Sequence, residues 1–149
     1  MKTLKFALLG VGRIGKIHAR NISLNPKSSI EFIYDTNKEA ANNISKLYGG
    51  RVAPSAEDAI SNPEVDAVFI CTATPTHIDY ILMAAKAGKS ILCEKPIDLE
   101  TLPLLAQCRQ HCHAHIFQKH LQIMAFFYHQ LLSSEQPNIL LMRESKLDE

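Results

Sequence analysis

Short apolar runs alternate with amphipathic segments between residues 4 and 93 of the chain. Continuous apolar runs bounded by turn residues predict buried strands, and apolar residues recurring at helical spacing predict helices. Such strands joined by helices are typical of a parallel sheet covered on both faces. We therefore predict an α/β fold, a doubly wound parallel sheet with strand order 3-2-1-4-5 and room for a sixth strand. The predicted strands span residues 4–9, 30–34, 51–53, 65–72 and 90–93, and the predicted helices lie at 13–24, 40–48, shortly after Ser55 and at 78–85.

Two polar pairs predict helix starts within this pattern. Ser55, with Asp58 three residues later, has the form of a capping box for a small helix. Thr76 and Asp79 form a similar pair before the last of these helices, which Gly88 would end.

Three glycines follow the first apolar run and open the first predicted helix. Gly10 would permit the tight turn, Gly12 would let the backbone approach a diphosphate, and Gly15 would let the helix pack close to the strand. The N–H groups at the helix start would then face the phosphates. We count Arg13 and Ile14, which lie between the glycines, among the cofactor-binding residues.

Asp35 ends the second predicted strand, twenty residues beyond Gly15. A carboxylate at this position is expected to accept hydrogen bonds from the adenosine ribose of a dinucleotide and to repel the extra phosphate of NADP. The predicted cofactor is therefore NAD. Lys38 lies close enough to leave NADP open, as in a different Rossmann enzyme such as a sugar or biliverdin reductase relative.

Thr72, Pro75 and His77 follow the fourth predicted strand. They could simply break that strand and begin the next helix. Ligands bind at the carboxyl ends of the strands in such sheets, so we also predict that this loop contacts the cofactor.

Composition narrows the function only modestly. The chain has 149 residues, which suits one domain, and a formal net charge of +1, which favours neither nucleic acid nor an anionic membrane as a partner. It contains no run of 18 apolar residues, so we expect no transmembrane helix and a cytoplasmic location. Its four cysteines form no disulfide framework. We expect no metal site, because the cysteines and histidines near residues 108–120 lack a recognised zinc spacing; they are Cys108, His111, Cys112, His113, His115 and His120.

The character of the sequence changes near residue 103. A helix is predicted to start near Thr101, a second to span residues 115–132, and a short strand to lie at 139–142. The apolar residues of the second helix are too widely spread for a clean stripe. If left exposed, the residues around Phe126 would favour self-association.

Residues 68–98 contain a specific series of motifs. A predicted strand is followed by the loop Thr-Ala-Thr-Pro-Thr-His, then by a helix, a second strand and Glu94-Lys95-Pro96. With the opening glycines, this resembles the N-terminal half of the Gfo/Idh/MocA oxidoreductase family, and within it most closely the inositol 2-dehydrogenases. The resemblance covers about residues 1–102. It implies hydride transfer between NAD and a secondary hydroxyl of a polyol or sugar. Lys95 would lie by the nicotinamide as the catalytic residue, Glu94 would orient it, and Pro96 would fix the turn.

The sequence departs from the family after residue 102. Family members carry a second domain, an open antiparallel sheet that supplies most substrate contacts. We therefore expect a dinucleotide-binding domain at residues 1–102, followed by a helical or poorly ordered tail at 103–149. The expected molecule is a truncated form with little turnover. The alternative is a non-enzymatic NAD-binding or protein-interaction module.

Overall fold

A computed structural model describes residues 3–95, 97, 114–116 and 139–141 of the chain. Its elements alternate between strand and helix as far as residue 93, as the apolar pattern predicted. In chain order they are β1 (Leu4–Leu9), α1 (Arg13–Leu24), β2 (Ser28–Tyr34), α2 (Lys38–Tyr48), β3 (Arg51–Val52), α3 (Ala56–Ser61), β4 (Ala67–Ile70), the 3-10 helix η1 (Thr74–Thr76), α4 (His77–Lys86), β5 (Ser90–Cys93), β6 (Ala114–Ile116) and β7 (Ile139–Leu141).

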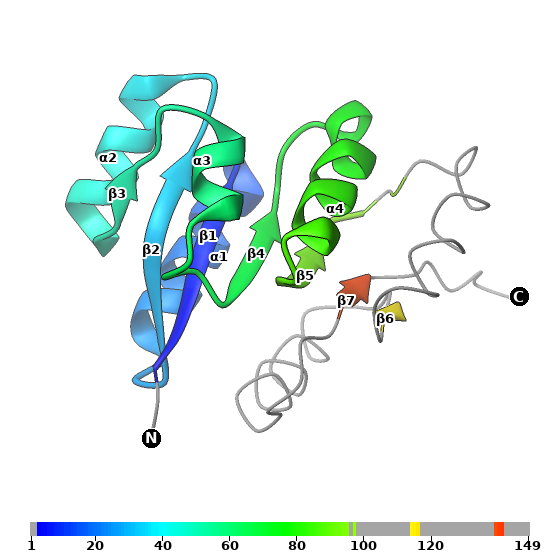
Figure 1. The fold of residues 1–149 in the computed structure, drawn as a ribbon. Helices are drawn as coiled ribbons and strands as arrows, with labels where there is room; N and C mark the ends of the chain where they lie inside the picture. The colour runs from blue at the N-terminus through cyan, green and yellow to red at the C-terminus, as the bar shows by residue number, and fades with distance from the viewer. Residues whose placement is uncertain (1–2, 96, 98–113, 117–138, 142–149) are drawn as a thin grey trace, which may run out of the picture.

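The strands form one sheet in the order β3-β2-β1-β4-β5-β7-β6, and every neighbouring pair is parallel (Figure 1). The predicted order of the first five strands is confirmed, and β7 beside β5 confirms the short strand predicted at 139–142. Parallel strands need a crossover connection, which here contains a helix. Strands that are consecutive in the sequence therefore need not be neighbours in the sheet.

The helix predicted at residues 115–132 is wrong at its start, because residues 114–116 form β6 and pair with β7 in register His115↔Leu140. Pairing at a sheet edge overrides local helical spacing when the apolar residues do not form a clean stripe. The remainder of that helix, the helix near Thr101 and the apolar residues around Phe126 lie outside the described residues. The proposed division at residue 102 stays a prediction.

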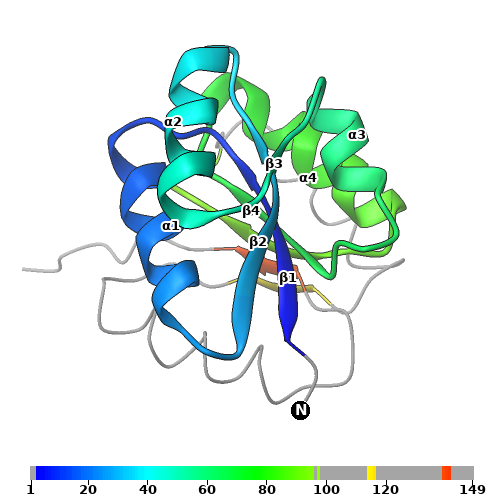
Figure 2. The same ribbon diagram turned by 90° about the vertical axis from the view of Figure 1, so that its left-hand side faces the viewer.

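Helices cover both faces of the sheet, giving three layers (Figure 2). Helices α1 and α2 pack on one face, where Ile22 and Ile44 meet the inward side chains of Phe6, Leu8 and Phe69. Helices α3 and α4 pack on the other face. The alternation of side chains along each strand supplies both cores, since successive residues point to opposite faces.

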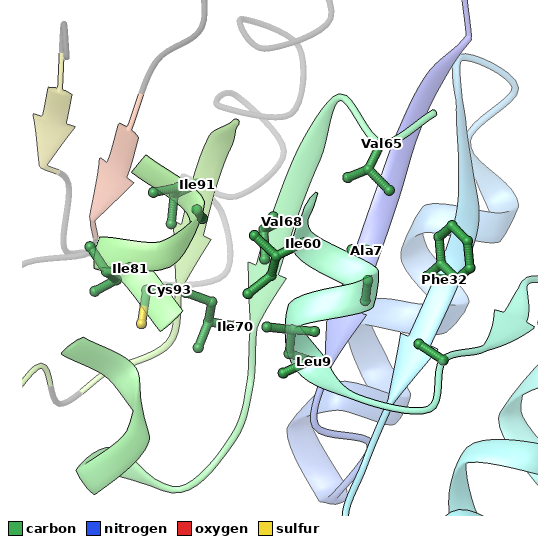
Figure 3. Close-up of a cluster of buried hydrophobic side chains, with 14 residues drawn as sticks. Ala7, Leu9, Phe32, Ile60, Val65, Val68, Ile70, Ile81, Ile91 and Cys93 are labelled. Carbon is green, nitrogen blue, oxygen red and sulfur yellow. The ribbon is translucent and has the colours of Figure 1, made fainter. Parts of the chain in front are cut away.

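The second core shows how continuously apolar the central strands must be. Ala7, Leu9 and Ile70 from β1 and β4 belong to one buried cluster with Ile60 of α3, while Ile81 of α4 lies over β5 (Figure 3). All five side chains are fully buried. Because both faces are covered, every position of β4 and β5 is buried, which explains the apolar runs at residues 67–70 and 91–93.

The two predicted caps have different outcomes. Ser55 caps α3 as predicted, its hydroxyl accepting from the Asp58 N–H at 3.0 Å. The Thr76–Asp79 cap is wrong, because η1 runs directly into α4 and Thr76 already has helical backbone angles. Its hydroxyl instead donates to the Ala73 carbonyl at 2.8 Å and contacts the Thr72 hydroxyl at 2.7 Å.

In the described part of the chain, no helix is both long enough and apolar enough to cross a bilayer.

Candidate functional site

The carboxyl ends of four strands meet at one edge of the sheet. Leu9, the last residue of β1, pairs with Tyr34 of β2 and Ile70 of β4, and Ile70 pairs with Cys93 of β5. The residues that follow these strands are therefore neighbours. They are Gly10, Asp35, Cys71 and Glu94, of which Gly10, Asp35 and Glu94 were predicted to contact a cofactor.

Two of the three glycines are required by the fold itself. Gly10 has φ +86°, and a Cβ there would lie 2.6 Å from the carbonyl of Cys71. A Cβ on Gly15 would lie 2.0 Å from the Gly10 carbonyl oxygen, so no larger residue fits where α1 crosses the loop. These contacts confirm the tight turn and the close helix packing predicted for these two positions.

Gly12 has no such constraint. Its φ of −63° suits any residue, and a Cβ there would meet nothing within 4 Å in the described structure. A side chain at position 12 would instead occupy the open space in front of α1. The described structure therefore leaves this space open, and the predicted approach of a diphosphate to Gly12 stays a prediction.

The start of α1 is left uncapped on the same side. Gly12 offers no side-chain cap, and the first turn of α1 contains no acidic residue. The N-terminal N–H groups of a helix need partners from outside the helix, and an anion satisfies them. Arg13 is exposed beside this opening, whereas Ile14 is partly buried against the α1–α2 core.

Asp35 lies next to the glycine loop and binds it. One carboxylate oxygen accepts from the Val11 N–H at 2.7 Å, and the other accepts from the Asn37 N–H at 2.8 Å. The carboxylate thus fixes the loop conformation as well as lying where a ribose is expected. Sequence spacing predicted the position of Asp35 but gave no signal for its bond to Val11.

The loop after β4 contains η1, with Pro75 exposed and Thr72 partly buried. The ring of His77 is buried, and its Nε2 lies 2.9 Å from the Thr72 carbonyl oxygen. Through this contact, His77 holds the loop after β4 in place. Direct contact of Thr72, Pro75 or His77 with a cofactor stays a prediction.

Glu94 follows β5 and makes the shortest polar contact of the edge, 2.6 Å from its Oε1 to Nε2 of His18 on α1. Burial raises the pKa of the Glu94 carboxyl. The hydrogen bond with His18 and the electrostatic effect of its ring, with smaller contributions from Lys95, outweigh burial and set this pKa below its ordinary value. Lys95 is exposed next to this pair, and Pro96 lies outside the described residues.

Sequence reasoning missed His18. The signal available was its place three residues after Gly15, on the apolar side of the helix between Gly15 and Ile22. A buried polar ring on the apolar side of a helix is expected to form a hydrogen bond with a group from another element.

The cysteines at this edge are unreactive packing residues. Cys71 and Cys93 are buried, and burial raises the pKa of both thiols, with the Glu94 charge acting in the same direction. Among the described residues no group of His, Cys, Asp or Glu side chains is arranged to bind a metal. The side chains near residues 108–120 that were considered for zinc lie outside this set.

Similar proteins share both the sequence and the fold. The chain is 48% identical over 99 residues to an inositol 2-dehydrogenase of Rhizobium meliloti (strain 1021), an alignment covering 66% of this chain and 29% of that protein. The crystal structure of scyllo-inositol dehydrogenase from Lactobacillus casei with bound NAD(H) and scyllo-inositol matches with a TM-score of 0.69 at 32% identity, covering 74% of this chain and 34% of that one. A myo-inositol dehydrogenase from Corynebacterium glutamicum ATCC 13032 matches with a TM-score of 0.65 at 36% identity, covering 73% and 32%. The chain thus spans about a third of the length of these relatives.

The family match is broader than the resemblance deduced from motifs. The Gfo/Idh/MocA model, described as an oxidoreductase family with an NAD-binding Rossmann fold, matches residues 4–126, beyond the boundary expected at residue 102. The family description also agrees with NAD as the predicted cofactor. The glycine loop, the strand order and the family match together show that this chain belongs to the Gfo/Idh/MocA family of NAD-binding oxidoreductases.

Proposed function

We propose that this chain binds NAD at the carboxyl edge of its sheet and contributes to hydride transfer between NAD and a secondary hydroxyl of a polyol. An inositol is the favoured substrate, because the similar proteins named above are inositol dehydrogenases. One observation carries the proposal. The parallel register brings the open space beside Gly12, the carboxylate of Asp35 and the exposed side chain of Lys95 to the same edge.

The residues present fit a dinucleotide. The open space beside Gly12 and the uncapped start of α1 suit the diphosphate, and Asp35 suits the adenosine ribose. The loop at Thr72–His77 and the segment at Glu94–Lys95 come from the next two strands along the edge, so they suit the nicotinamide half. When bound, the nicotinamide supplies the hydride acceptor.

Lys95 is proposed to act on the reacting hydroxyl. As hydride leaves the carbon, negative charge develops on the hydroxyl oxygen, and a nearby ammonium stabilises it. The hydroxyl proton passes to water, which reaches the exposed side chain of Lys95, while the ammonium stabilises the oxygen that remains. Glu94, ionised and bound to His18, places a counter-charge beside the ammonium.

Replacing Lys95 separates binding from chemistry. We expect Lys95→Ala to reduce inositol-dependent NADH formation by about 10²- to 10³-fold, the usual contribution of a group that stabilises a developing oxyanion. NADH affinity, followed by nicotinamide fluorescence, should change by less than about 3-fold, a change in binding free energy well under about 1.4 kcal/mol. The chain contains no tryptophan, so protein background is small. Lys86→Ala is the matched control, because Lys86 is an exposed lysine at the end of α4.

Two results would change the assignment. Loss of NADH binding in Lys95→Ala would make Lys95 a cofactor ligand. Saturable NADH binding by the unmodified chain with no response to myo- or scyllo-inositol would favour the non-enzymatic NAD-binding module.

A further inference from the structure

His18 links the start of the phosphate-facing helix to the segment that carries Lys95. It lies on α1, six positions after Gly12, and is 5% exposed. Its ring packs against Phe69 of β4, with the ring centroids 4.1 Å apart and the planes tilted by 36°. The imidazole therefore has one orientation set by packing, aimed at the end of β5.

Among the described residues, the one hydrogen-bond partner of the His18 ring is Glu94. The Glu94 carboxyl is 17% exposed and ionised, so at 2.6 Å the His18 Nε2 carries the proton and donates to Oε1. On its other side, Nδ1 is buried with no hydrogen-bond partner among the described residues. A buried nitrogen without a partner costs stability, whereas the neighbours Ala19 and Ile22 fill the same face with apolar atoms at no such cost.

The contact immobilises Glu94 from two sides. Its backbone N–H donates to the Ile70 carbonyl at 2.9 Å, continuing the β4–β5 ladder by one residue, and its side chain is bound by His18. The next residue, Lys95, leaves the sheet and is exposed. The direction in which Lys95 leaves the edge is therefore set by how Glu94 is fixed.

We infer that His18 is a positioning residue, which fixes Glu94 and through it orients Lys95 toward the substrate. The inference rests on the proposed function for the role of Lys95. The contacts of His18 are with Glu94 and Phe69, so its proposed effect on Lys95 passes through Glu94.

The test compares side chains that can and cannot reach Glu94. His18→Gln places an amide N–H near the position of Nε2, whereas His18→Phe retains the ring volume and removes the donor. We expect His18→Phe to lower kcat for inositol oxidation by about 10-fold or more, with the KM for NAD within about 3-fold of the unmodified chain. His18→Gln should restore kcat to within about 3-fold. If His18→Phe does not fold, His18→Asn, whose shorter amide cannot reach Glu94, takes its place.

A second readout does not depend on turnover. Hydrogen exchange at the Lys95 amide should accelerate by about 10-fold in His18→Phe and return toward normal in His18→Gln. The amide of Leu92, inside β5, should be unaffected. Ile22→Val is the control, because it perturbs the same face of α1 one turn later without touching Glu94.

A merely structural role predicts a different pattern. The inference is overturned if His18→Phe lowers the melting temperature as Ile22→Val does but leaves kcat and Lys95 exchange unchanged. It is also overturned if folded His18→Gln restores neither. If the unmodified chain forms no NADH from inositol, the proposed function fails, and the exchange measurement alone decides whether His18 fixes Lys95.

Discussion

Individual residues at the sheet edge are constrained for different reasons that the sequence alone does not separate. Gly10 and Gly15 are needed because main-chain atoms approach them closely, whereas a Cβ on Gly12 would meet no atom of the described residues. The spacing of the three glycines could be predicted to bind a dinucleotide, because the motif is local. The hydrogen bonds between Asp35 and Val11 and between Glu94 and His18 could not be predicted. Their partners are 24 and 76 residues apart, and a local sequence pattern contains no information about such tertiary contacts.

Asp35 is predicted to set the choice between NAD and NADP by its charge. Asp35→Asn retains an acceptor for the Val11 N–H but removes the charge that would repel a ribose phosphate. We expect the ratio of NADPH to NADH affinity to rise by about 10-fold or more, equivalent to about 1.4 kcal/mol. Titration of both nucleotides by fluorescence measures it.

Asp35→Ala is the companion variant, since it removes both the charge and the acceptor. It should weaken both nucleotides by loosening the glycine loop. An unchanged affinity ratio in Asp35→Asn would mean that another group, such as Lys38, decides the preference.

At the scale of elements, the strands were the best predicted feature and the ends of elements the least. Buried strands are continuous apolar runs, so their existence follows from composition over a few residues. The ends of the strands depend on the strands beside them. The fourth strand was predicted to end at residue 72, but β4 ends at Ile70, level with the ends of its partners β1 and β5. Likewise, the Thr76 cap was wrong because a preceding 3-10 turn supplied the start of α4. Such limits are set by tertiary pairing, which short sequence windows do not contain.

The cap of α3 is a local feature with a measurable effect on stability. Ser55→Ala removes the acceptor of the Asp58 N–H and is expected to lower the free energy of unfolding by about 0.5–2 kcal/mol. Urea denaturation followed by circular dichroism gives this value. Ser61→Ala is the matched control, because that exposed hydroxyl on the same helix donates to the Glu57 carbonyl and caps nothing. Equal effects of the two substitutions would refute the assigned cap.

At the scale of the whole molecule, one sheet edge gathers groups from four segments, and its electrostatics contribute to stability. The Glu94 carboxyl has a pKa below its ordinary value of 4.5, so the folded state favours its ionised form. A depressed pKa contributes stability that is present above the ordinary pKa and is lost as the pH falls through the folded value. Acid should therefore weaken the link between α1 and the end of β5.

Glu94→Gln should flatten this acid response. Between about pH 5 and about pH 3, its free energy of unfolding should fall less than that of the unmodified chain, because it has no carboxylate to protonate. Urea denaturation across that range provides the measurement. Glu39→Gln, at the exposed start of α2, controls for the loss of one negative charge. An acid slope in Glu94→Gln as steep as that of the unmodified chain would contradict the assigned pKa direction.

The most direct test of the account is an NADH titration of the chain and of Gly12→Ala, read by nicotinamide fluorescence. The added methyl group would meet no atom of the described residues within 4 Å, so the variant should melt within a few degrees of the unmodified chain. If a diphosphate occupies that space, saturable binding of NADH should weaken by about 10-fold or more in the variant, a loss of about 1.4 kcal/mol. Equal affinity in the two proteins, or no saturable binding by the unmodified chain, would contradict the account.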